Sequence, residues 1–390
     1  MSVIPRFSRR SRWVIPAGAV AAVAAVATVS AITVAQAAPA LPARTPAELL
    51  AAVAGDRSAP PPLTGTVVET ASLGVPQLPG DYNPTSITSL LAGSHTLKVW
   101  YGGPARLRLA VPVQLGETDF ILNGTTAWLW QSNTDAVTKF VVPSRQSREQ
   151  AVKRVASRVP LTPQQAAQQA LAAVGPSTRV TTESNVTVAS EAAYQLVIAP
   201  KSSGSLIGKI TIALDAQHLS VPLRVQVFAR GATSPAFQVG YQSISFVQPA
   251  AANFSFTPPP GATVHTARAA EAGFSSKPMP ASQASQFQVI GKNWLSVAVL
   301  PASALSQVAG KGNAAGVAGQ AARSASGGGG SLSGGEVFGA ILGAAHPVHG
   351  VWGSGRLLRT ALLSMLITNG HVLAGAVTPS VLYAAAAQVK

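Results

Sequence analysis

The chain has 390 residues, a formal net charge of +15 at pH 7 and no cysteine. Without cysteine the protein cannot form a disulfide framework, carry a lipid on a cysteine or use a thiol in catalysis, so burial of apolar side chains must hold the fold together. A chain of this length can bury a large core, in one large domain or in two smaller ones.

The amino terminus has the features of an export leader. Arginines within residues 6–12 precede an apolar run over 14–35, and Ala35-Gln36-Ala37 is a small-x-small cleavage pattern. These features are typical of a signal peptide, so we predict a leader over 1–37 and an exported protein that works in the periplasm or at the cell envelope. The apolar run is also close to the length that spans a bilayer. The alternative is therefore an uncleaved leader that tethers the protein to the membrane.

A helix and a series of short strands follow the leader. The helix is predicted over 45–56, where Thr45 can cap its start and Gly55 can end it. The polar segment 74–93 is interpreted as a long excursion between strands, and Asn123-Gly124 predicts a hairpin. Strand-like runs separated by Gly, Pro and Asn lie at 64–71, 94–103, 104–111, 117–124, 125–132 and 136–143.

The run TTAWLWQS (125–132) contains two tryptophans. Side chains alternate between the faces of a strand, so Trp128 and Trp130 share one face while Ala127 and Leu129 share the other. Because both faces are apolar, this strand is either covered by protein on both sides or lines a cavity on one side. The alternation shows that the tryptophans share a side but not which side it is.

A basic stretch, SRQSREQAVKRVASR (144–158), holds the main local excess of positive charge and contains no aromatic residue. Surfaces that bind nucleic acid interleave basic and aromatic side chains, so we expect no nucleic-acid partner. We interpret the stretch as a solvated face of a helix or loop. The alternative is a surface attracted to an anionic membrane or wall polymer.

The second half of the sheet region begins after a helix predicted over 162–175, with Thr162 as its cap and Pro163 in its first turn. Strands and helices do not alternate regularly, which predicts an α+β fold, mainly antiparallel β, with one large curved sheet. FSFTPPPGATVH (254–265) closes this region, because proline cannot donate to a strand ladder. The further strand-like runs lie at 185–200, 205–217, 223–230 and 236–246.

The remaining residues predict a linker and a small carboxy-terminal α/β domain. We expect a first domain over 38–265, a linker over 266–290 and the second domain over 291–390, which contains a flexible Gly/Ser-rich loop at 309–335. Asn369-Gly370 separates two apolar runs, which predicts a hairpin followed by a short helix.

No catalytic constellation is found. The 13 acidic residues show no paired-carboxylate spacing, and no G-x-S-x-G, S-x-x-K or phosphate-binding loop occurs. His346 and His349 are three residues apart, but the adjacent proline and glycine argue against a helix that presents both rings, so we interpret them as a surface loop, with a metal site as the alternative. We predict no enzymatic activity, no cofactor and no metal.

The order of these features resembles the outer-membrane lipoprotein carrier (LolA) and RseB/MucB superfamily. The resemblance covers about residues 45–265 and is carried by "TGTVVET", "PARLRL", "NGTTAWLW" and "FSFTPPPGATV" in that order. It implies an unclosed antiparallel β-barrel covered by helices, whose concave apolar side accepts acyl chains of lipids or lipoproteins.

On this resemblance we expect an exported, non-enzymatic binding protein that holds lipid or lipoprotein acyl chains. Arg106 and Arg108 are expected either at the rim of the cavity, near a headgroup, or on a solvated face. The candidate cavity residues are Trp128, Trp130, Leu97, Val99, Leu107, Leu109, Phe120, Leu122, Ile210, Ile212, Val225 and Val227.

Two other functions stay open. One is an RseB-like extracytoplasmic regulator that binds an anti-sigma factor or another envelope protein, with residues 291–390 as the module that faces the partner. The other is a cell-envelope hydrolase of unrecognised type, which would need a polar cleft with convergent acids.

Overall fold

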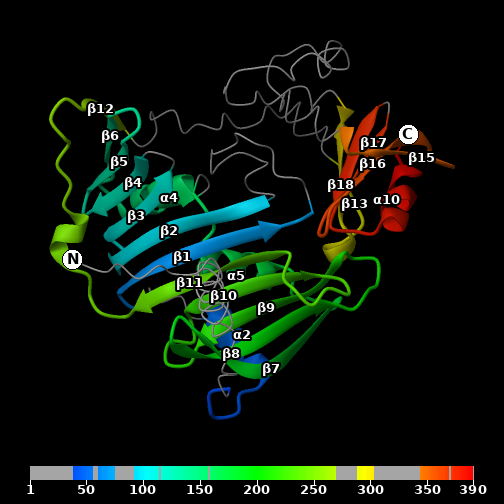
Figure 1. Cartoon of the computed structure of the whole chain (residues 1–390), viewed down its shortest axis with the longest axis horizontal. Coiled ribbons are helices and arrows are strands. Elements are labelled where there is room, and N and C mark those ends of the chain that lie inside the picture. Colours follow the sequence, from blue (N-terminus) through cyan, green and yellow to red (C-terminus); the bar gives the residue numbers. More distant parts are fainter. Residues whose placement is uncertain are drawn as a thin grey trace, which may run out of the picture. The chain divides into compact units, whose positions relative to one another are not determined.

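The large sheet has twelve strands in the order β12-β6-β5-β4-β3-β2-β1-β11-β10-β9-β8-β7 (Figure 1). Neighbours pair antiparallel, except that β12 pairs parallel with β6. Its two edges, β12 and β7, do not pair with each other, so the predicted unclosed, mainly antiparallel sheet is confirmed. Its strands are β1 (Leu63–Ser72), β2 (Ala92–Gly103), β3 (Arg106–Val113), β4 (Gly116–Asn123), β5 (Thr126–Gln131), β6 (Ala136–Val141), β7 (Thr178–Val188), β8 (Glu191–Pro200), β9 (Ile207–Asp215), β10 (Pro222–Ala229), β11 (Phe237–Ser245) and β12 (Thr263–Arg268).

The computed structural model describes residues 38–55, 60–74, 92–113, 116–156, 159–268, 288–302, 343–368 and 370–389. The predicted leader (1–37) and the Gly/Ser-rich loop (309–335) lie outside these residues, as do 75–91 of the excursion and 269–287 of the linker. Contacts group Pro39–Lys390 into one unit, and the domain boundaries drawn from the sequence stay a prediction. Within the described ranges, no helix has both the length and the apolar character needed to cross a membrane.

The predicted hairpin connects β4 and β5, but its two-residue loop begins one residue later than the sequence indicates. Asn123 pairs with Thr126, so the loop consists of Gly124 and Thr125 instead of Asn123 and Gly124. Gly124 has a φ of 61°, in the left-handed region that glycine adopts without the steric penalty of a side chain. The hairpin sets the register that places Trp128 and Trp130 on one face of the sheet.

Three helices cover one face of the large sheet: α2 (Pro46–Gly55), α4 (Arg145–Ala156) and α5 (Pro163–Ala172). The cap predicted for α5 is confirmed, because Thr162 Oγ1 accepts from the Gln165 N–H at 3.3 Å and the Thr162 N–H donates to the Gln165 side chain at 2.9 Å. The basic stretch forms α4, whose Ala151 and Val155 are buried against the sheet.

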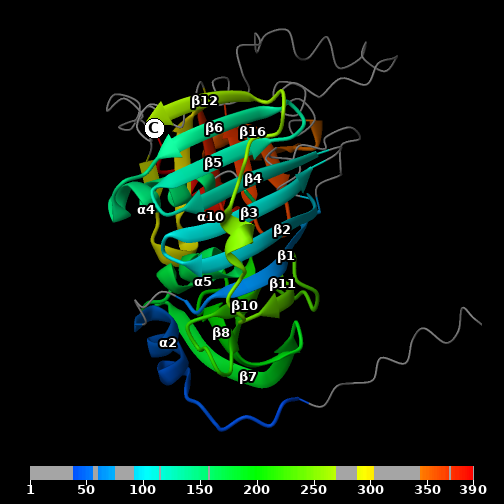
Figure 2. The same ribbon diagram turned by 90° about the vertical axis from the view of Figure 1, so that its left-hand side faces the viewer.

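The opposite face of β2–β6 is crossed by the segment that joins β11 to β12. This segment, residues 246–262, contains the short helix η2 (Ala251–Phe254) and is called the strap. In Figure 2 the strap runs in yellow-green in front of these strands. Phe254 is 1% exposed, so the strap contributes a fully buried anchor to this face.

A second sheet of six antiparallel strands follows, in the order β13-β14-β18-β17-β16-β15. The hairpin and helix predicted near the carboxy terminus are confirmed by β17, β18 and α10. A hydrogen bond from Trp294 Nε1 to Thr178 Oγ1, at 2.8 Å, links the residues that precede β14 to β7. The elements are β13 (Gln288–Ile290), η3 (Asn293–Leu295), β14 (Val297–Pro301), β15 (His346–Gly350), β16 (Gly353–Arg359), β17 (Ser364–Thr368), β18 (His371–Gly375) and α10 (Pro379–Ala386).

The interpretation of 346–349 as a surface loop is wrong, because these residues form β15. Pro347 is tolerated there since β15 is an edge strand, where one side of the backbone needs no partner. His346 and His349 are an odd number of residues apart in this strand, so alternation points their rings to opposite faces. Among the described residues no group of three or more His, Asp or Glu could hold a metal ion.

Candidate binding site

The aliphatic and phenylalanine candidates for a cavity all lie on one face of the large sheet. They belong to a single apolar cluster with residues of α2, α4 and α5, and we call this side of the sheet the helix-covered face. Cross-strand pairing brings them together, since Leu109 pairs with Phe120 and Ile212 pairs with Val225. The candidates on this face are Leu97, Val99, Leu107, Leu109, Phe120, Leu122, Ile210, Ile212, Val225 and Val227.

The helices meet this face mostly with small side chains. The buried residues that they supply are Leu49, Val53, Ala151, Val155, Ala166, Ala167 and Ala170. Helix α5 buries only alanines in this cluster, whereas α2 and α4 also bury Leu49, Val53 and Val155. An interior of this kind provides apolar surface and few polar groups, which is the chemistry that an acyl chain requires.

Glu69 is a buried carboxyl on the helix-covered face that sequence reasoning missed. It is 2% exposed, and its Oε2 accepts a hydrogen bond of 2.7 Å from the backbone N–H of Leu161, between α4 and α5. Burial raises the pKa of Glu69, although the bond from Leu161 acts in the opposite direction. The sequence did carry a signal, because Glu69 lies between Val67 and Ala71 in the alternation of β1.

Replacing Glu69 with alanine is expected to lower the free energy of unfolding by about 2 kcal/mol, because the N–H of Leu161 then stays buried without an acceptor. Chemical denaturation of the two proteins measures this difference. The matched control is Thr70→Ala on the opposite side of β1, which should change the free energy by less than about 0.5 kcal/mol because that side chain is exposed. Equal effects of the two substitutions would contradict the role of Glu69.

Trp128 and Trp130 lie on the opposite face from the other cavity candidates. Ala127 and Leu129 belong to the helix-covered cluster, so alternation turns the two indoles away from it. Phe256 of the strap packs on both indoles, with ring centroids 5.5 Å from Trp128 and 6.0 Å from Trp130. The structure therefore does not bring the tryptophans together with the other candidates. Both indoles lie on the side of the sheet that the strap crosses.

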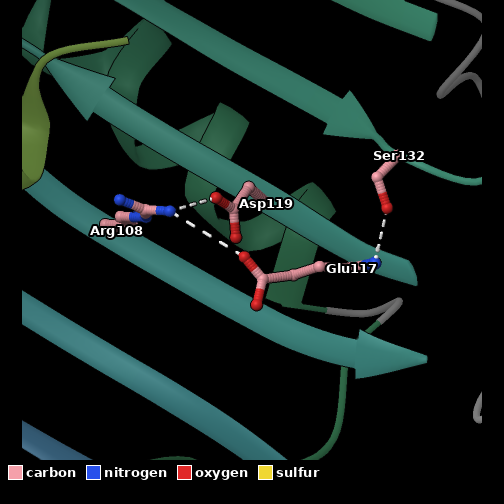
Figure 3. A network of polar contacts seen from close by, with 4 residues as sticks. All are labelled: Arg108, Glu117, Asp119 and Ser132. Carbon is pink, nitrogen blue, oxygen red and sulfur yellow. Dashed lines mark hydrogen bonds and ion pairs between the residues drawn. The ribbon is translucent and has the colours of Figure 1, made fainter. Parts of the chain in front are cut away.

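Arg108 lies on the same face as the tryptophans and is part of a polar network (Figure 3). Its guanidinium donates to Asp119 Oδ2, lies 3.8 Å from Glu117 Oε1 and stacks 5.2 Å from the ring centroid of Trp100. The Glu117 N–H in turn donates to Ser132 Oγ at 2.7 Å. Arg106, the other predicted rim residue, is exposed at the start of β3.

Asp119 is the most deeply buried acid of this network, with its side chain 1% exposed. Burial raises its pKa to about 6, the neighbouring Glu117 adds to this rise, and the charge of Arg108 opposes it. On this face, Arg108 Nε, Asp119 Oδ1 and Trp130 Nε1 are buried and have no hydrogen-bond partner among the described residues. We call the surface formed by Trp100, Arg108, Asp119, Trp128, Trp130 and Lys139 the tryptophan face.

Comparison with models of known protein families gives no match, and neither does comparison with curated proteins. Solved structures do match. MucB of Pseudomonas aeruginosa, in complex with MucA, is 12% identical over 87% of this chain and 96% of its own, with a TM-score of 0.38. A LolA superfamily protein from Nitrosomonas europaea is 9% identical over 55% and 99% of the two chains, with a TM-score of 0.22. The lipoprotein LppX of Mycobacterium tuberculosis is 11% identical over 50% and 92%, with a TM-score of 0.26.

Both classes of protein that the sequence motifs resemble are thus among the matched structures. With TM-scores of 0.38 or lower, none of these similarities assigns a function to this chain.

Proposed function

We propose that the protein is an exported, non-enzymatic binding protein that holds the acyl chain of a lipid or lipoprotein against the helix-covered face of the large sheet. One observation supports the proposal above the others. The apolar candidates from strands on both sides of β1 share one continuous cluster, and α5 meets this cluster with the buried alanines Ala166, Ala167 and Ala170. The proposed binding region lies between the sheet and this alanine side of α5.

The hydrophobic effect provides enough free energy for such binding. Each methylene transferred from water into an apolar interior contributes about 0.8 kcal/mol, so about ten buried methylenes contribute about 8 kcal/mol. Part of this gain is offset because the chain loses conformational freedom on binding. No catalytic group is needed, since the ligand is held by burial alone.

The covering layer can move without disrupting the sheet. The ladder of the large sheet is formed between strands, and none of its described backbone pairs involves α4 or α5. A shift of these helices would leave the strand pairing intact and would open the space between their alanines and the sheet. Glu69 bonds the connection between the two helices to β1 and so limits this movement.

Filling the space beneath α5 tests the proposal. Ala167 is fully buried against the sheet, whereas Ala172 on the same helix is exposed. We expect Ala167→Phe to weaken uptake of the fluorescent fatty acid cis-parinaric acid at least about tenfold, because its ring occupies the volume that the acyl chain needs. Ala172→Phe adds the same ring to the solvent side and should leave uptake unchanged.

Circular dichroism and thermal unfolding should first show that both variants are folded. If the wild-type protein takes up no cis-parinaric acid, or if the two variants take it up equally well, acyl binding beneath α5 is contradicted.

A further inference from the structure

We propose that the tryptophan face, together with the strap that crosses it, docks on the surface of an anionic lipid bilayer. Uncharged residues of the strap enter the headgroup region, while lysine and arginine side chains around it contact the lipid phosphates. This surface lies on the opposite side of β2–β6 from the helix-covered face, so it does not depend on the acyl-binding function. Its valines, its strap and its cations each point to a bilayer.

The exposed valines described in the large sheet and the strap gather on this side. Val247 of the strap is 72% exposed, Val141 of β6 is 49% exposed and Val264 of β12 is 46% exposed. Val137 pairs with both Trp130 and Val264, so alternation turns Val141 and Val264 to the side of the indoles. Exposed apolar side chains that gather on one surface are typical of membrane or partner contacts.

The strap, residues 246–262, contains no Asp, Glu, Lys, Arg or His. Its inward side is fixed by Phe254, which is 1% exposed, and by Phe256, which packs on two indoles. Its outward side includes the exposed alanines at 250–252, and Figure 2 shows the strap in front of β2–β6. Charged groups make entry into a membrane costly, so an uncharged segment held on this side of the sheet is suited to the headgroup region.

The strands beneath the strap carry an excess of positive charge on the same side. Cross-strand pairing and alternation from the indoles identify four cations and two acids there, a net charge of +2. The cations are Lys98, Arg106, Arg108 and Lys139, and the acids are Glu117 and Asp119. Arg108 is paired with both acids, whereas the other three cations form no ion pair with a described residue. These three are available to lipid phosphates, which attract basic side chains near a membrane surface.

The basic helix α4 is the alternative contact with a bilayer, and it lies on the helix-covered face. Arg145 of α4 is 80% exposed but is bonded to Glu149 at 2.8 Å, and the apolar residues Ala151 and Val155 turn inward. Binding to a membrane surface increases with buried apolar area as well as with charge. The strap and the tryptophan face offer both attractions, whereas the described residues of α4 offer charge alone.

Sedimentation with lipid vesicles tests the proposal. Residues 38–390 are used, because they contain the whole described fold and because an apolar leader would itself enter a bilayer. We expect binding to vesicles of equal parts phosphatidylglycerol and phosphatidylcholine, and binding at least about tenfold weaker to phosphatidylcholine alone, since each cation near an anionic surface contributes about fivefold. Salt at about 0.5 M should remove most of this difference, because it screens the charges.

Val247→Asp tests the entry of the strap into the headgroup region. It should weaken binding to the anionic vesicles at least about fivefold, because it replaces an apolar side chain at the bilayer with a negative charge. Val289→Asp is the matched control, since Val289 is a 65% exposed valine of the second sheet. It makes the same change in net charge and should leave vesicle binding unchanged.

Arg106→Gln tests the cations and should weaken binding to the anionic vesicles about fivefold. Arg145→Gln removes an equal charge from α4 and should leave this binding unchanged. Ala167→Phe, which fills the region proposed for the acyl chain, should also bind the vesicles like the wild-type protein, so failure of the one proposal is distinguishable from failure of the other. Circular dichroism should show that every variant is folded.

Four results would overturn the proposal. They are equal binding of the wild-type protein to neutral and anionic vesicles, no binding to either, equal effects of Val247→Asp and Val289→Asp, and equal effects of Arg106→Gln and Arg145→Gln. Binding to dextran sulfate without binding to the vesicles would also overturn it, because the cations would then recognise an anionic polymer and not a bilayer.

Discussion

Replacing Arg108 with alanine is expected to lower the free energy of unfolding by about 3 kcal/mol at pH 7. The reason is that Asp119 would keep its burial, with a side chain 1% exposed, and lose the guanidinium that bonds its Oδ2. Urea denaturation of the wild-type and variant proteins measures the difference. Arg106→Ala is the matched control on the same strand, and it should change the free energy by less than about 0.5 kcal/mol because Arg106 is exposed.

The same carboxyl predicts how stability depends on pH. Its pKa is raised in the folded protein to about 6, from an ordinary value of 3.8, so the folded state binds the proton more tightly than the unfolded state does. The contribution of Asp119 to stability is therefore fully present below about pH 4 and is lost as the pH rises to about 6. The change in the free energy of unfolding amounts to about 3 kcal/mol, since each unit of difference between the folded and unfolded pKa is worth about 1.4 kcal/mol.

Two results would contradict this account of Asp119. The penalty of Arg108→Ala should shrink toward pH 4, where the carboxyl is protonated in the folded protein, so a constant penalty between pH 4 and pH 7 would contradict a buried charge as its cause. Asp119→Asn should flatten the pH dependence between pH 4 and pH 6. If the stability of the Asp119→Asn protein changes with pH as steeply as that of the wild-type protein, other groups are responsible for the pH dependence.

Replacing Phe254 with alanine is expected to have a similarly large effect, about 3 kcal/mol, because its ring is 1% exposed and anchors the strap to the large sheet. The contact is close: a Cβ added at Gly102 of β2 would lie 3.0 Å from the ring of Phe254. Loss of the anchor should also loosen Phe256 from Trp128 and Trp130. We therefore expect the tryptophan emission to shift to longer wavelength as these indoles become hydrated.

Val247→Ala is the control within the strap, because Val247 is 72% exposed. It should leave both the stability and the emission spectrum unchanged. A Phe254→Ala protein with wild-type stability would show that the strap is not held by this residue, and an unchanged emission would show that the indoles do not depend on it.

Local patterns were enough to predict most elements of the large sheet. The alternation of Leu107 and Leu109 with Arg106 and Arg108 identified β3, and Thr162 identified the start of α5. β15 was missed because a proline in a short, exposed sequence looks like a loop. Only the pairing partner shows that Pro347 lies on an edge strand, where it is tolerated.

The candidate sites were less predictable, because alternation within a strand does not identify the face that the rest of the chain covers. Trp128 and Trp130 were grouped with the aliphatic candidates on this account. Their actual neighbour, Phe256, is more than a hundred residues away in the sequence and reaches them through the strap. The role of Glu69 likewise depends on a distant backbone group, the N–H of Leu161.

Native mass spectrometry of the protein expressed with its predicted leader, followed by organic extraction, tests the central claim most directly. If the helix-covered face holds acyl chains, the wild-type protein should carry acyl species that the Ala167→Phe protein lacks and the Ala172→Phe protein retains. A folded wild-type protein that emerges without lipid, and that acquires none when lipid is added, would contradict the proposed function.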